Sequence, residues 1–224
     1  MRQSCSGVIL AGGLATRCGG ENKALLPLGG ARLLDRIFDV YRQVFADIIL
    51  VTNRPLDFLD WDATIVSDIF PERSSLTGIH AGLFYCEHPF AFVSACDTPF
   101  LRREVIELVL DRVRPQVDLV LPCTASGAEP LCAVYSRRCL KPIETALRQG
   151  HMKIRLALAG RRTETVSETE LRARDPELRS FFNVNTLEDL TAAERLLAQA
   201  EAGARAETVR PVESEPHEPK AGPT

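Results

Sequence analysis

A short apolar strand that runs directly into a glycine-rich loop opens the chain. Residues 7–28 read GVILAGGLATRCGGENKALLPL, with two glycine pairs and basic side chains at Arg17 and Lys23. Glycines let backbone N–H groups approach phosphate oxygens that a Cβ atom would block, and successive inward N–H groups form an anion-binding concavity. The segment therefore predicts a seat for a nucleoside triphosphate, with Arg17 and Lys23 supplying the cationic charge.

Two better-known phosphate-binding loops do not match this spacing. No Gly-Lys-Ser/Thr sequence follows the glycines, so the P-loop pattern fails. The dinucleotide pattern G-x-G-x-x-G fails as well, because Gly12-Gly13 is followed next by Gly19-Gly20. A glycine-rich strand-to-helix turn without any ligand is the simpler alternative, and the number of coincident elements in this one loop disfavours it.

The chain is long enough for one sizeable core and short for two, since it has 224 residues, of which 45% are apolar and 25% charged. We expect one domain over residues 1–202. From about Gly203 the sequence consists of Ala, Glu, Pro and Arg with almost no apolar content. This composition predicts a disordered tail over residues 203–224.

Composition also restricts the partners. No apolar run approaches the roughly 20 residues that span a bilayer, and the chain opens on its first strand rather than on a signal peptide, so we expect a cytoplasmic protein without a membrane partner. A net charge of −3 argues against a nucleic-acid surface and places anion binding in a local site. The seven cysteines contain no C-x-x-C pair, which favours small apolar roles for most of them.

Strand-like apolar runs alternate with helical patterns along most of the chain. Strands are predicted at 8–10, 48–52, 64–66, 90–94, 119–122 and 163–166. Helices are predicted near 33–44, 78–87, 103–112, 136–149, 153–159 and 188–200. This βαβ succession predicts an α/β fold with a single doubly wound, mostly parallel, Rossmann-like sheet flanked by helices, whose ligands lie beyond the carboxyl ends of the strands.

A second chemical motif follows the strand predicted at 90–94, where the sequence Ala95-Cys96-Asp97-Thr98-Pro99 places a carboxylate at the carboxyl edge of the sheet. Asp97 is the first choice for a metal ligand, because Mg²⁺ is often held by one or two carboxylates plus substrate phosphates. The structural alternative is that Asp97 caps the helix that follows or forms an Asx turn before Pro99. The glycine loop on the neighbouring strand end favours the functional interpretation.

Further candidates are expected at the same edge. Asp68 follows the strand at 64–66 and is a candidate contact of the nucleoside, while Thr77-Gly78 is expected to begin a helix whose N-terminal amides face the site. Asn53 follows the strand at 48–52 and is either a turn former or a base contact. His80 lies in an apolar helical stretch, which favours a packing role.

The last motif is Asn183-Val184-Asn185, which precedes the acidic start of the final helix. Alternation puts both amides on one face of a short strand. The pair either caps the helix or orients a second substrate or a metal-bound water.

Together these motifs resemble the molybdenum cofactor guanylyltransferases, within the Rossmann-like nucleotidyltransferases of the nucleotide-diphospho-sugar transferase type. The resemblance covers roughly residues 6–197. The positions that carry it are LAGG at 10–13, Arg17, Gly19-Gly20, KAL at 23–25, TGIHAG at 77–82, CDTP at 96–99, EPL at 129–131, AVY at 133–135 and NVNT at 183–186. The chain departs from the usual pattern at Cys18, at Asn22 and at Thr77-Gly78.

The resemblance implies a Mg²⁺-dependent transfer of GMP from GTP to the terminal phosphate of molybdopterin, with release of pyrophosphate. It implies catalytic roles for Arg17, Lys23 and Asp97, the last also binding Mg²⁺. The implied GTP-binding residues are Leu10, Ala11, Gly12, Gly13, Lys23, Asn53, Asp68 and Asp97. Asn183 and Asn185 would lie toward the pterin substrate, and molybdoenzymes or their chaperones are further partners that the resemblance allows.

Three alternatives stay open. A cytidylyltransferase acting on the same pterin, or a sugar-phosphate nucleotidyltransferase, would use the same machinery. Asp68 suits guanine, which offers a ring N–H and an exocyclic amine as donors, whereas cytosine presents one amine. A non-catalytic GTP-binding adaptor that delivers the cofactor is the alternative from another class, and the presence of Arg17, Lys23 and Asp97 together argues against it.

Overall fold

A central β-sheet runs in the strand order β10-β7-β9-β6-β1-β4-β5, with β8 paired to β7 off that path. The computed structural model describes residues 4–12 and 22–208, with side chains described as far as residue 200. The strands of this sheet are β1 (Cys5–Leu10), β4 (Ile48–Val51), β5 (Thr64–Val66), β6 (Phe90–Ala95), β7 (Leu119–Thr124), β8 (Gly127–Ala128), β9 (Cys132–Ser136) and β10 (Thr163–Val166). Strand β1 is parallel to β4 and β6, β4 to β5, and β7 to β10. The predicted mostly parallel α/β sheet is thus confirmed.

Two strands of the sheet depart from the parallel pattern, and the short β8 is antiparallel to β7. Strand β9 is antiparallel to both β6 and β7, and its five residues are all buried. A strand buried on both faces reads as a continuous apolar run without alternation, so periodicity does not reveal it. The helix predicted over 136–149 therefore starts later, because residues 132–136 form this strand and the turn η3 (Arg137–Cys139) precedes α4.

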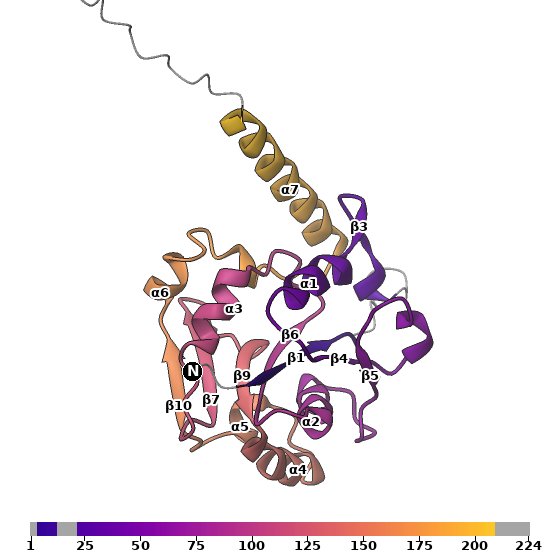
Figure 1. Cartoon of the computed structure of the whole chain (residues 1–224). Helices are drawn as coiled ribbons and strands as arrows, with labels where there is room; N and C mark the ends of the chain where they lie inside the picture. The colour runs from indigo at the N-terminus through magenta and orange to yellow at the C-terminus, as the bar shows by residue number, and fades with distance from the viewer. Residues whose placement is uncertain (1–3, 13–21, 209–224) are drawn as a thin grey trace, which may run out of the picture.

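Helices cover both faces of the sheet, as Figure 1 shows. On one face lie α1 (Leu33–Arg42), α3 (Arg103–Leu110) and α6 (Glu168–Arg172), and on the other α2 (Ser75–Tyr85), α4 (Leu140–Arg148) and α5 (Ile154–Ala157). An apolar core lies on each face of the sheet, and β1 contributes side chains to both. Ile9 packs into the first core, and Val8 and Leu10 pack into the second. This alternation of side chains on one strand is what a doubly wound sheet requires.

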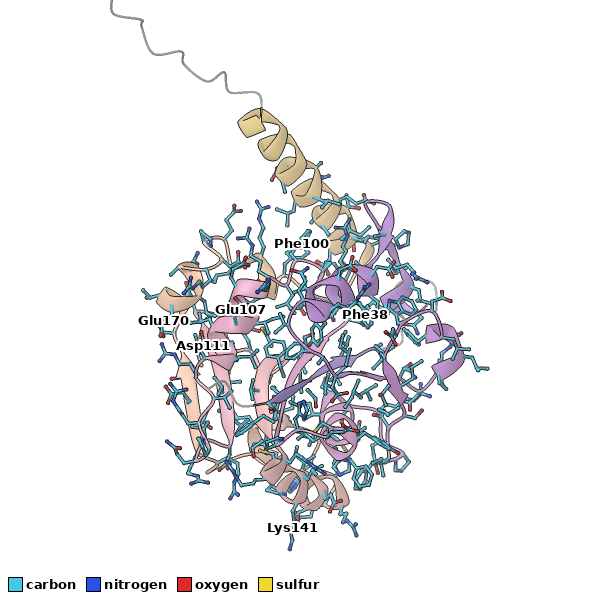
Figure 2. The ribbon with its side chains drawn as sticks, in the orientation of Figure 1. Phe38, Phe100, Glu107, Asp111, Lys141 and Glu170 are labelled. Atoms are coloured by element: carbon cyan, nitrogen blue, oxygen red, sulfur yellow. The ribbon has the colours of Figure 1, made fainter. Side chains whose placement is uncertain are left out.

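A third, smaller apolar cluster joins the last helix to the body. The hairpin of β2 (Pro27–Leu28) and β3 (Ala31–Arg32) contributes Leu28, which packs with Val184 and Ala193. Helix α7 (Leu187–Thr208) begins here and projects away from the sheet (Figure 1). Phe100 belongs to the same cluster and lies near the foot of α7 (Figure 2).

The short helical turns complete the described chain. They are η1 (Lys23–Leu25), η2 (Pro55–Phe58) and η4 (Arg179–Phe181), in addition to η3. Helix α7 continues to Thr208, beyond the predicted end near residue 200, and residues 209–224 of the predicted tail lie outside the described residues. Within the described part of the chain, no helix is both long and apolar enough to cross a membrane. The six cysteines of that part are free.

Two glycines set how closely α2 approaches the sheet. A Cβ atom on Gly78 would lie 3.1 Å from Cδ2 of Leu10, and one on Gly82 would lie 2.5 Å from Cγ1 of Val8. Because Gly78 and Gly82 are four residues apart, they share one face of α2. This contact places the first turn of α2 against the carboxyl end of β1, where the glycine-rich loop begins.

Candidate active site

A cavity of about 430 Å³ opens where β1, β4, β5 and β6 end. The predicted site residues that line it are Leu10, Gly12, Lys23, Asp68, Asp97 and Asn185. They come from five separate stretches of sequence. The topology thus gathers the predicted motifs at the carboxyl edge of the sheet, where ligands of open α/β sheets bind.

Lys23 lies at the centre of this group. Its Nζ donates hydrogen bonds to Oδ2 of Asp97 at 2.7 Å and to Oδ1 of Asn185 at 2.8 Å. The side chains of Lys23 and Asp97 are 11% and 19% exposed, so this ion pair is largely shielded from water. Asn22 fixes the start of η1 by accepting the N–H of Ala24 at 3.2 Å, which aims Lys23 into the cavity.

The backbone at Asp97 is tied to two neighbouring segments. The N–H of Cys96 donates to the carbonyl of Leu10 at 3.0 Å, and the carbonyl of Asp97 accepts the N–H of Val184 at 2.8 Å. Helix α3 takes no side-chain cap at its N-cap residue Arg102, so Asp97 does not serve as that cap. One carboxylate oxygen of Asp97, Oδ1, is buried and has no hydrogen-bond partner among the described residues.

Asn53 and Asp68 form a pair at the ends of the adjacent strands β4 and β5. Nδ2 of Asn53 donates to Oδ2 of Asp68 at 2.7 Å, and the backbone N–H of Asp68 donates to Oδ1 of Asn53 at 3.3 Å. Burial raises the pKa of Asp68, although the Asn53 amide and the nearby positive charge of Arg73 oppose this effect. Asp68 faces the main cavity, and Asn53 lines a small adjoining hollow of about 90 Å³ together with Ala11 and Gly12.

Arg73 is a site residue that the sequence motifs did not single out. It lines both the main cavity and the adjoining hollow, next to Asp68. The signal that marks it is a basic residue directly before a helix cap. Ser74 caps α2 by accepting the N–H of Thr77 at 3.2 Å, so the helix begins at Ser75 and not at Thr77-Gly78 as expected.

The two asparagines of the last motif line different cavities. Residues 182–185 form neither helix nor strand, which corrects the predicted short strand. Asn185 faces Lys23, whereas Nδ2 of Asn183 donates to the carbonyl of Phe181 at 3.0 Å and lines a second cavity of about 470 Å³. At the start of α7, Oγ1 of Thr186 accepts the N–H of Asp189 at 3.1 Å, and Oδ2 of Asp189 in return accepts the N–H groups of Asn185 and Thr186 at 2.8 and 2.9 Å. This cap holds Asn185 in place.

His80 lies outside the cavity lining. Its side chain is 1% exposed and packs edge-on against Phe70, with ring centroids 5.0 Å apart. Burial lowers the pKa of His80, and Nε2 lies 3.4 Å from Oε1 of Glu144. The predicted packing role agrees with this environment.

Two other predicted residues, Gly13 and Arg17, lie outside the described residues. Within residues 4–12 and 22–208, no group of three or more His, Cys, Asp or Glu side chains gathers as a metal site would.

Sequence comparison assigns the family. Residues 7–166 match the family described as the MobA-like NTP transferase domain. A molybdenum cofactor guanylyltransferase of Desulfosudis oleivorans is 49% identical over 189 residues, which cover 84% of this chain and 94% of that protein. A probable molybdenum cofactor guanylyltransferase of Pelotomaculum thermopropionicum is 36% identical over 87% of this chain and 93% of its own length.

A solved structure agrees. The crystal structure of molybdopterin-guanine dinucleotide biosynthesis protein A from Archaeoglobus fulgidus superposes with a TM-score of 0.77 and 29% identity, over 87% of this chain and 99% of that one. The fold is that of the nucleotide-diphospho-sugar transferases. The chain belongs to the MobA-like NTP transferase domain family and is a nucleotidyltransferase akin to the molybdenum cofactor guanylyltransferases.

Proposed function

We propose that this nucleotidyltransferase transfers GMP from GTP to the terminal phosphate of molybdopterin and releases pyrophosphate. The observation that carries the proposal is the cluster of Lys23, Asp97 and Asn185 beside Gly12, in a chain 49% identical to a molybdenum cofactor guanylyltransferase. A cation and a carboxylate placed beside a backbone anion seat suit phosphoryl chemistry between two anionic substrates.

The nucleotide base is assigned to Asn53 and Asp68. A carboxylate accepts two hydrogen bonds side by side, and guanine offers a ring N–H and an exocyclic amine in that arrangement. Asn53 holds one oxygen of Asp68 at 2.7 Å and so fixes the plane of the carboxylate. Cytosine presents a single amine there, which favours GTP over CTP.

The triphosphate is assigned to the loop at Gly12 and Gly13, with Lys23 and Arg17 as its cations. Arg73 adds a third positive charge at the mouth of the cavity, directly before the N-terminus of α2. A helix N-terminus carries partial positive charge and favours phosphate groups. These groups offset the repulsion between the two anionic substrates.

Asp97 fits a magnesium ion. Its Oδ1 is buried and has no hydrogen-bond partner among residues 4–12 and 22–208, and Mg²⁺ needs only one or two protein carboxylates when phosphates and water supply the remaining ligands. A bound Mg²⁺ would polarise the phosphates as a Lewis acid. Asp97 would hold the ion while Lys23, hydrogen-bonded to Asp97 and Asn185, stays directed at the phosphates.

The reaction needs no protein base. An oxygen of the acceptor phosphate forms a bond to the α-phosphorus of GTP, the bond from that phosphorus to the β-phosphate bridge breaks, and the electron pair leaves with pyrophosphate. A phosphate monoester with a second pKa of about 6 is largely dianionic at neutral pH, so it attacks without giving up a proton. The chain's own residues contribute charge, position and orientation.

Identification of the product tests this function. Incubation of the full chain with molybdopterin, Mg²⁺ and an equal mixture of GTP and CTP should yield the guanine dinucleotide, identified by its mass. A cytosine dinucleotide would keep the mechanism and reject the guanine assignment. GTP binding without any product would favour the non-catalytic adaptor.

A further inference from the structure

The second cavity, of about 470 Å³, is a neighbour of the first on the carboxyl edge of the sheet. Two short segments of the chain line both cavities. Glu129 and Asn183 line the second cavity, while Leu131 and Asn185, each two positions further on, line the first. Two residues span at most about 7 Å, so a molecule of modest length can occupy both cavities.

The lining of this second cavity suits a flat ring. Phe181, Phe182, Leu178 and Leu196 supply apolar surface from η4 and α7. The ring of Phe182 is itself fixed by an edge contact with Phe100, at a centroid distance of 5.9 Å. Aromatic side chains favour stacked or edge contacts with heteroaromatic rings.

Among the described residues that line this cavity, one carboxylate has no cation as its partner. Glu168 and Glu177 are paired with Arg172 at 2.8 Å and with Arg179 at 2.7 Å. Glu129 has no cation within ion-pair distance among the described residues, and its Oε1 accepts only the hydroxyl of Thr124, at 3.1 Å. Burial raises the pKa of Glu129, and the hydrogen bond from Thr124 opposes this effect.

The segment around Leu178, which lines the same cavity as Glu129, is held in a fixed backbone conformation. Leu178 has φ of 53°, the only positive φ among the described residues other than glycine. The buried Asp175 fixes it, because its carbonyl accepts the N–H of Leu178 at 2.9 Å and its Oδ2 accepts the N–H of Ser180 at 2.7 Å. Strained backbone of this kind is found preferentially at ligand sites.

We infer that Glu129 is a specificity-determining residue that accepts the ring N–H and the exocyclic amine of a pterin, whose fused rings lie against Phe181. The inference rests on the proposed function. It places the ring in the second cavity and the phosphate end of the same molecule toward Asn185 and Asp97 in the first. A two-point hydrogen bond to a carboxylate fixes the plane and direction of the ring as well as adding affinity.

Direct binding tests the recognition chemistry. The full chain is titrated with pterin, and with lumazine, in which a carbonyl replaces the exocyclic amine, by following ligand fluorescence. The wild type should bind pterin more tightly than lumazine by roughly ten- to a hundredfold, and Glu129→Gln should lose that preference. Glu177→Gln is the matched control, since this carboxylate lines the same cavity but is 66% exposed and paired with Arg179. It should keep the preference.

Steady-state kinetics separates this inference from the proposed function. At saturating GTP, Glu129→Gln should raise the KM for molybdopterin by roughly ten- to a hundredfold, with the KM for GTP unchanged. A wild type that turns over molybdopterin and a Glu129→Gln variant with the same KM and the same pterin preference would overturn the role of Glu129 alone. No pyrophosphate release by the wild type with molybdopterin would overturn both proposals.

Discussion

Nζ of Lys23 lies 2.7 Å from Oδ2 of Asp97, a residue 74 positions further along the chain. The ion pair joins the glycine-rich loop after β1 to the end of β6. Because Oδ1 of Asp97 is buried without a hydrogen-bond partner in the described part of the chain, the pair can receive a further positive charge. In the proposed reaction that charge would be Mg²⁺, held by Asp97, while Lys23 contacts the phosphates.

Replacement of Asp97 by asparagine keeps the shape of the side chain and removes its charge. Asp97→Asn should lower turnover by roughly a hundredfold or more, because charge stabilisation by a metal ion is worth several kcal/mol. Pyrophosphate release over a Mg²⁺ titration measures this. Asp62→Asn, an exposed position before β5, is the control and should behave as wild type. A variant at position 97 with the full Mg²⁺-dependent rate would remove Asp97 from the metal site.

Lys23→Met preserves the length of the side chain without its charge. The change should lower kcat/KM for GTP by roughly a hundredfold, since Lys23 is largely buried and its charge is poorly screened there. Initial rates at varied GTP measure the effect, and circular dichroism checks that the variant is folded. An unchanged kcat/KM would mean that Lys23 only supports Asp97.

Asp68→Asn tests whether Asp68 recognises the guanine ring of the nucleotide. With the carboxylate gone, the preference for GTP over ATP should fall by roughly ten- to a hundredfold, the value of a hydrogen bond to a charged group. Competition binding of the two nucleotides measures this preference. Because burial raises the pKa of Asp68, the wild-type preference should decline on acidification at a higher pH than an exposed aspartate would give. Asp68→Asn should show no such decline, and an identical pH profile in both proteins would contradict the assignment.

How far the sequence determines this architecture is clearest at β1 and β9. Strand β1 was predictable because Val8, Ile9 and Leu10 form an apolar run that ends at glycines. Strand β9 was not, because its five residues are buried on both faces and carry no alternation. The region that follows therefore resembled one long helix from residue 136, although α4 starts at Leu140.

The residues of the candidate site likewise divide into those that the sequence predicts and those that it does not. Each of Lys23, Asp97 and Asn185 follows or precedes a recognisable element, so placement of these side chains at one edge follows from parallel topology. Arg73 has only a weak signal, its place directly before a helix cap, and a single arginine in such a loop has many structural explanations. Asn183 and Asn185 face different cavities because of the path of the loop before α7. A hydrogen bond from the N–H of Val184 to the carbonyl of Asp97 sets this path, and the conformational preferences of the loop residues do not.

A charge cluster outside the candidate active site should control how the free energy of unfolding changes at acidic pH. Burial alone would raise the pKa of Asp118, but hydrogen bonds from Arg138 at 2.7 Å and from the backbone of Arg162 at 3.1 Å outweigh it and lower the pKa to about 2. Asp118 binds fewer protons in the folded state, so its contribution is present above about pH 4 and is lost as the pH falls toward 2.

Asp118→Asn should accordingly cost roughly 2 kcal/mol of unfolding free energy at neutral pH. Urea unfolding at a series of pH values measures the difference between variant and wild type, which should shrink between pH 4 and pH 2. A difference that does not change over this range would show that the ionised carboxylate is not responsible.

Because α2 lies close to β1, we expect alanine at Gly82 and alanine at Gly78 to destabilise the protein to different extents. Gly82→Ala should destabilise the protein by about 1–3 kcal/mol, because the new Cβ atom would lie 2.5 Å from Cγ1 of the stiff side chain of Val8. Gly78→Ala should cost less, since its nearest atom is 3.1 Å away on the more flexible Leu10, and alanine favours helices. Thermal unfolding of both variants checks the order, and equal melting temperatures would contradict the contact.

We propose above that the edge of the sheet bearing Lys23 and Asp97 transfers a guanylyl group to molybdopterin. The most direct measurement is pyrophosphate release by the full chain with molybdopterin and Mg²⁺, comparing GTP with CTP, ATP and UTP, for the wild type and Asp97→Asn. We expect more release with GTP than with the other nucleotides, and loss of that release in the variant. Equal release with every nucleotide, or release that survives in Asp97→Asn, would contradict it.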